Sequence, residues 1–216
     1  WNSRIEDLDR PDELRIDLDP SPGVDFDMLR EGASEVKALL DELGIKAFPK
    51  TTGSRGIHIY VHAGGDHDSY QVRTCAVALA RELERRRPDL MTWQWWKEER
   101  GERVFIDYNQ NCPHKTIFGV WGVRANDDAR VSAPFTWDEL PTVDIYALNL
   151  ATVPARLQAL GDPWAAMYND PQSLQPLLEM SAKDTANGML DAPWPPVYPK
   201  QPNEPPRVAP SRAKKP

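Results

Sequence analysis

The sequence predicts an α+β fold, α/β-like in the alternation of its elements, with helices packed on one face of a sheet. Residues 13–19 and 57–62 alternate apolar and polar side chains, as half-buried strands do. The segments after these strands repeat apolar residues every three or four positions, as amphipathic helices do. A chain of 216 residues, 40% of them hydrophobic and 27% charged, can bury one good-sized core.

The first predicted strand, residues 13–19, has one apolar and one charged face. The apolar face consists of Leu14, Ile16 and Leu18, and the charged face consists of Arg15, Asp17 and Asp19. Two prolines and a glycine within 20–23 end this strand. A helix should follow, with Asp25 as its N-cap and Gly44 at its end.

The middle of the chain predicts a second strand and helix pair. Residues 45–49 could form a short strand, and 51–56 form a loop. The strand at 57–62 places His58 on its polar face. The next helix begins at about Ser69, capped by Asp68, and ends before Pro88.

The second half is less regular. Residues 91–97 and 102–109 suit two strands joined like a hairpin by the charged turn 98–101. A short helical turn at 137–140 and a short helix at 152–160 follow. From about residue 184 the chain is Pro-rich and polar, so we predict a catalytic domain over 1–183 and a disordered tail over 184–216.

Charge and composition narrow the class of protein. The formal net charge of −7 argues against a simple DNA-coating protein, since phosphate contacts demand basic surface. It argues less against a metal-dependent polymerase, whose carboxylates are offset by bound cations. Two cysteines, Cys75 and Cys112, are too few for a metal knuckle and fit a reducing cytoplasm. We expect no membrane span, because no apolar run reaches 18 residues.

Three acidic residues form the strongest chemical pattern. Asp17 and Asp19 lie two positions apart on one strand, so both side chains point to the same face and can converge on hard cations. Asp107 interrupts an apolar run, where a buried acid needs a partner such as a metal. The alternative is that all three are ordinary acids at strand ends or edges.

The segment Thr52-Gly53-Ser54-Arg55-Gly56 is a second pattern. Backbone N–H groups of glycine-rich turns can cradle phosphate oxygens, and Arg55 and His58 could add donors. Such a loop is a weak signal alone, because tight turns often have this composition. Gln110 and Arg124 could reach a ligand or could equally be surface residues.

At these residues the chain resembles the polymerase domain of bacterial ligase D, a branch of the archaeo-eukaryotic primase superfamily. The resemblance covers about residues 1–180 and rests on separated motifs in the family's order: PDELRIDLDP at 11–20, TGSRGIHIY at 52–60, VFIDYNQN at 104–111 and FTWDEL at 135–140.

The resemblance implies an RRM-like antiparallel or mixed catalytic sheet and a template-dependent nucleotidyltransferase of non-homologous end joining. Such an enzyme adds ribo- or deoxyribonucleotides to a primer 3′-hydroxyl at DNA breaks or gaps, using two Mn²⁺ or Mg²⁺ ions. By position, metal binding falls to Asp17, Asp19 and Asp107. Nucleotide binding falls to Thr52, Ser54, Arg55, His58, Gln110 and Arg124. The implied partners are DNA, NTP or dNTP, Ku and a DNA ligase, in a bacterial cytoplasm close to the nucleoid.

The chain departs from the family pattern in two ways. Arg55 stands where many members have Lys, which keeps the charge. The chain starts at Trp1, so we expect an N-terminally truncated piece that lacks the module for a 5′-phosphate and a stacking aromatic.

Two other classes of function stay open on the sequence. Ile16-Asp17-Leu18-Asp19 also resembles the haloacid-dehalogenase phosphatases, in which Asp17 would be a nucleophile. The later acidic pair that this family needs is poorly placed, since Asp127-Asp128 lies in loop-like sequence. An acidic chain could also be a non-catalytic interaction module.

Overall fold

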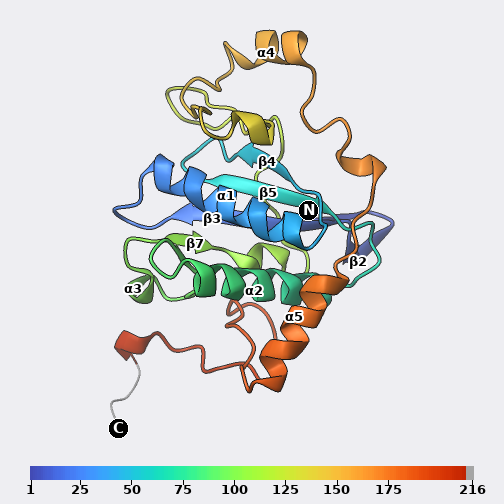
Figure 1. Ribbon diagram of the computed structural model, residues 1–216, viewed down its shortest axis with the longest axis vertical. Coiled ribbons are helices and arrows are strands. Elements are labelled where there is room, and N and C mark those ends of the chain that lie inside the picture. Colours follow the sequence, from blue (N-terminus) through green and yellow to red (C-terminus); the bar gives the residue numbers. More distant parts are fainter. Residues whose placement is uncertain (213–216) are drawn as a thin grey trace.

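A five-stranded mixed sheet organises the computed structural model, which describes residues 1–212 (Figure 1). The strand order is β4-β5-β3-β7-β6. The bounds are Glu13–Pro20 for β3, Phe48–Thr51 for β4, Ile57–His62 for β5, Met91–Thr92 for β6 and Val104–Ile106 for β7. The predicted α+β class is confirmed.

Two long helices, α1 (Phe26–Glu42) and α2 (Ser69–Arg86), lie against the same face of the sheet (Figure 1). Both begin where the sequence predicted. The Asp25 side chain accepts from the N–H of Met28, and Asp68 and Gln71 form a reciprocal capping box. Their apolar stripes meet the apolar residues of β3 and β5, so the core lies between helices and sheet.

Smaller elements surround this sheet. A separate two-stranded sheet pairs β1 (Ser3–Arg4) with β2 (Asp7–Pro11). The remaining α-helices are α3 (Lys97–Arg100), α4 (Val153–Leu160) and α5 (Gln175–Ala186). The 3₁₀ turns are η1 (Tyr108–Asn111), η2 (Trp137–Glu139), η3 (Met167–Asn169) and η4 (Pro210–Arg212). Within residues 1–212, no helix combines the length and apolarity needed to cross a bilayer.

The predicted hairpin over 91–109 is wrong. The strand at 91–97 shortens to β6, which pairs with β7 in parallel, and the charged residues 97–100 form α3 instead of a turn. The Arg100 guanidinium donates to the carbonyls of Gln94 and Trp95, which closes the chain into a helical turn. A parallel pair needs such a crossover between its strands.

The predicted disorder from residue 184 is also corrected over much of its length. α5 runs to Ala186, and the segment behind it packs against α2. Trp194 is only 3% exposed. The physical reason is that buried arginines on α2 satisfy backbone carbonyls of this proline-rich segment, a contact that composition cannot reveal. Residues 213–216 of the predicted tail lie outside the described residues.

Candidate active site

Three acidic side chains converge where β3 adjoins the end of β7. Asp17 and Asp19 share one face of β3, and Asp107 directly follows β7, where its N–H donates to the Asp17 carbonyl at 2.9 Å. One carboxylate oxygen from each residue lies within 4.8 Å of the other two, so the group could hold a metal ion. The structure therefore brings together the three acids that the sequence singled out.

The electrostatics of this cluster are those of crowded, desolvated carboxylates. Burial raises the pKa of Asp17 to about 7, against the opposing effect of Lys50 and Arg124. Burial, followed by the charges of Asp17 and Asp19, raises the pKa of Asp107 to about 7. For the more exposed Asp19, partial desolvation and Asp17 raise the pKa to about 6. Neutralisation by a cation would relieve this repulsion without protonating the acids.

His58 stands beside Asp17 in the row formed by paired residues of β3 and β5. Its Nε2 lies 3.2 Å from Oδ1 of Asp17, but neither that oxygen nor the buried Nδ1 of His58 has a hydrogen-bond partner among residues 1–212. Burial lowers the pKa of His58 well below 6.5, so the imidazole is neutral at pH 7. Unpartnered buried polar atoms at this point fit a site that a ligand or metal completes.

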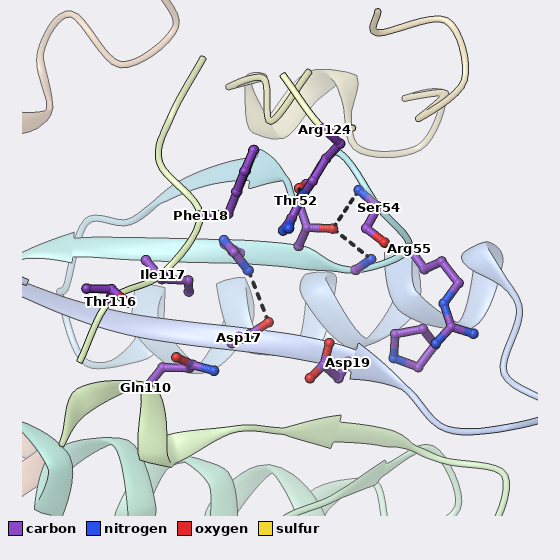
Figure 2. Close-up of a pocket in the computed structure, with 13 residues that line it drawn as sticks. Asp17, Asp19, Thr52, Ser54, Arg55, Gln110, Thr116, Ile117, Phe118 and Arg124 are labelled. Carbon is purple, nitrogen blue, oxygen red and sulfur yellow. Dashed lines mark hydrogen bonds and ion pairs between the residues drawn. The ribbon is translucent and has the colours of Figure 1, made fainter. Parts of the chain in front are cut away.

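The loop at 52–56 joins β4 to β5 and curls over β3 near the acids (Figure 2). The Thr52 hydroxyl accepts from the N–H groups of Ser54 and Gly56, each at 3.1 Å. Gly53 has φ +67°, and a side chain at Gly56 would meet the Leu18 carbonyl at 2.5 Å. The turn therefore requires its glycines.

A pocket of about 480 Å³ lies between this loop and the acids. Eight of the nine predicted site residues line it, and Asp107 joins through the carboxylate cluster. The eight are Asp17, Asp19, Thr52, Ser54, Arg55, His58, Gln110 and Arg124. Gln110 also donates to Asp107 Oδ2 at 3.0 Å, so it orients that carboxylate.

The wall formed by Thr116, Ile117 and Phe118 was not predicted from the sequence (Figure 2). The Arg124 guanidinium lies 3.7 Å from the Phe118 ring centroid and donates to the Thr52 carbonyl, so it ties this wall to the loop. No periodicity or motif marks residues 116–118, which is why sequence reasoning missed them.

Lys50 was also missed. It is fully buried, pairs with His58 across β4 and β5, and donates from Nζ to Ser132 Oγ at 2.5 Å and to the Phe118 carbonyl at 3.2 Å. Burial lowers its pKa to about 7. The available signal was its position: a lysine two residues before the loop, on the face that also carries His58.

Comparisons with known proteins identify the family that the chain resembles. The profile of the LigD primase-polymerase domain matches residues 1–164. The multifunctional non-homologous end joining protein LigD of Mycolicibacterium smegmatis is 37% identical over 169 residues, which cover 77% of this chain and 22% of that protein. The corresponding protein of Pseudomonas aeruginosa is 33% identical over 168 residues, covering 76% of this chain and 20% of that protein. The chain thus spans about a fifth of the length of these relatives.

A solved structure of the same family has a similar fold. The polymerase domain from Mycobacterium tuberculosis ligase D in complex with DNA matches with a TM-score of 0.68 and 33% sequence identity. The match covers 76% of this chain and 57% of that one. Because the family profile covers most of the chain, this protein belongs to the LigD primase-polymerase domain family.

Proposed function

We propose that this chain is a template-dependent nucleotidyltransferase that extends a primer 3′-hydroxyl on gapped or broken DNA in end-joining repair. The observation that carries the proposal is the convergence of three carboxylates beside a glycine loop, on a pocket large enough for a nucleotide. Curated relatives named for non-homologous end joining, and a solved ligase D polymerase domain in complex with DNA, support the same activity.

Asp17, Asp19 and Asp107 would hold two divalent ions, Mn²⁺ or Mg²⁺. Their donor set is all oxygen, which suits these hard cations. The unpartnered Asp17 Oδ1 and the raised pKa values of the three acids also fit a bound cation. Such ions supply charge stabilisation at the attacking and leaving oxygens of an in-line displacement.

The remaining pocket residues would bind and orient the nucleotide. Arg55 and Arg124 are the cations that line the pocket and would face the triphosphate. A neutral His58 can donate one hydrogen bond to a phosphate oxygen while it stays close to Asp17. Thr52 acts mainly through the loop, since its oxygen already accepts two N–H groups. Gln110 keeps Asp107 aimed at the pocket. Catalysis would therefore come from positioning and electrostatics.

Primer extension on a gapped duplex with Mn²⁺ tests the proposal, with ribo- and deoxyribonucleotides compared in parallel. Templated incorporation by the wild-type chain is expected, and Asp17→Ala should abolish it while circular dichroism shows an intact fold. Incorporation that persists in this variant would refute the assignment of the acids.

The alternatives are not favoured by the comparisons, which point to the primase-polymerase family and not to a phosphatase or a non-catalytic module. We further propose that the chain works with end-joining proteins such as Ku and a DNA ligase near the bacterial nucleoid. The names of its relatives support this role. Pull-down with purified Ku on a DNA end would test it, and absence of a ternary complex would count against it.

A further inference from the structure

The segment 190–207, which we name the strap, lies beyond the part of the chain that the family profile matches. It folds into a closed unit of its own. The Glu204 carboxylate accepts from the N–H groups of Trp194 and Gln201 and pairs with Arg207, whose guanidinium also reaches the Tyr198 carbonyl. A strap built in this way can hold a fixed position against its neighbours.

Arg73 of α2 anchors the strap. This side chain is 1% exposed, and its guanidinium carbon lies 3.9 Å from the ring centroid of Trp194. It donates to the Asp191 carboxylate at 3.1 Å and to the carbonyls of Ala192 and Pro193 at 3.0 and 3.2 Å. Within the described part of the chain, three of its four donated hydrogen bonds therefore go to the strap.

The remaining hydrogen bond of Arg73 goes to the turn that follows Asp107. Its Nε donates to Asn109 Oδ1 at 2.9 Å, and Asn109 Nδ2 donates to the Pro193 carbonyl at 3.1 Å. The guanidinium also lies 5.3 Å from the Tyr108 ring centroid. The strap and α2 thus contact both residues immediately after Asp107, namely Tyr108 and Asn109.

These contacts are connected to the carboxylate cluster by a single hydrogen bond. The backbone N–H of Asn109 donates to Asp107 Oδ1 at 3.0 Å, so the position of Asn109 sets the orientation of that carboxylate. A second contact holds the same region, because the Tyr198 hydroxyl donates to the Pro113 carbonyl at 2.8 Å. Groups that hydrogen-bond to a metal-binding carboxylate orient it and tune its affinity.

We infer that the strap is a positioning element of the metal site, acting through Arg73 and Asn109 on Asp107. The inference rests on the proposed role of Asp107 as a metal ligand. It assigns a task in the site to a proline-rich segment outside the matched family region and to an arginine that does not line the pocket.

The test is Mn²⁺ binding to the full chain, measured by electron paramagnetic resonance at pH 8, with the melting temperature recorded for each variant. Arg73→Met should weaken Mn²⁺ binding about tenfold, the lower end of the loss seen when outer-shell partners are removed. Arg85→Met is the matched control, because Arg85 lies on the same helix but pairs with Glu82 and Asp184, away from η1. It should change Mn²⁺ affinity by less than about twofold.

Wild-type Mn²⁺ affinity in Arg73→Met, with only the melting temperature lowered, would overturn the inference. If Arg73→Met fails to fold, Asp191→Ala decides, since Asp191 is partly exposed and contacts Arg73 from the strap side. About threefold weaker Mn²⁺ binding is expected there, and unchanged affinity would reject the strap's role.

The same measurements keep the two proposals apart. A wild-type chain that binds Mn²⁺ but never extends a primer would defeat the proposed function alone, and the comparison of Arg73 with Arg85 variants would still decide the role of the strap.

Discussion

The two faces of the central sheet are both buried, yet they do opposite things for the protein. On the apolar face, six side chains of β3 and β5 pack under the helices with exposures of 2% or less: Leu14, Ile16, Leu18, Ile57, Ile59 and Val61. On the polar face, five residues of β3, β4 and β5 are exposed by 5% or less: Arg15, Asp17, Lys50, His58 and Tyr60. Burial stabilises the first set and perturbs the charged groups of the second.

This difference shows that the polar face of the sheet carries charged groups whose burial lowers the stability of the fold. The pKa of Asp17 rises and the pKa of Lys50 falls, both to about 7, which means that each charged form is disfavoured by its surroundings. Asp17 and His58 also keep polar atoms that have no hydrogen-bond partner in the part of the chain that the structure describes. Such strain is expected at functional sites and not in a core.

Asp17→Asn, on the polar face, should have the largest effect on activity. It should lower nucleotide incorporation by roughly a thousandfold, because a metal-binding carboxylate that stabilises transition-state charge is lost. In the metal-free protein at pH 8 it should instead raise the free energy of unfolding by about 2 kcal/mol, since a desolvated charge disappears. Steady-state primer extension and urea titration measure the two effects, and a destabilised Asn variant would contradict this account of the polar face.

Leu18→Ala, the adjacent position on the opposite face, should have the reverse profile. Because Leu18 is fully buried, its replacement by alanine should lower the free energy of unfolding by about 3 kcal/mol. Mn²⁺ affinity per folded molecule should stay near the wild-type value. Urea titration combined with Mn²⁺ binding checks this, and a large loss of affinity would show that the two faces are not separable.

The pH dependence of stability sharpens the comparison further. The folded pKa of Asp17 and Asp107, about 7, lies above the ordinary value of 3.8. Between these pH values the folded state binds more protons than the unfolded state, so stability falls as pH rises from about 4 to about 7. We expect these two acids to cost the metal-free protein several kcal/mol over this range, because each unit of pKa difference is worth about 1.4 kcal/mol. Saturating Mn²⁺ should restore this lost stability above pH 7. A melting temperature that does not change with pH would argue against protonated acids.

Among the substitutions in the central sheet, Lys50→Met should give the smallest effect. Lys50 is the first of the charges that oppose the rise in the pKa of Asp17, so its removal should raise that pKa further. Mn²⁺ binding at pH 7 should weaken by about fivefold and recover toward wild type at pH 9. The control is Lys37→Met, a partly exposed residue paired with Asp41 on α1. Equal weakening at both pH values would assign Lys50 a role in holding the Phe118 wall instead.

Much of this arrangement was predictable because it is local. Strand alternation placed Asp17, Asp19 and His58 on one face of the sheet, and capping residues at Asp25 and Asp68 located both long helices. The parallel pairing of β6, the folding of 97–100 as α3 and the packing of the strap were not predictable, because each depends on contacts between distant segments. The contacts of Lys50 belong to the same group, since its partners Phe118 and Ser132 lie 68 and 82 residues further along the chain.

The sequence alone determined which side chains are apolar or ionisable and, through the period of two in its strands, which of them share a face. Only the tertiary structure decided that β7 lies beside β3, so that Asp107 meets Asp17 and Asp19. It also decided that the strap closes over Arg73. The physical reason is that backbone periodicity acts over a few residues, whereas strand order and the burial of charges depend on packing of the whole chain.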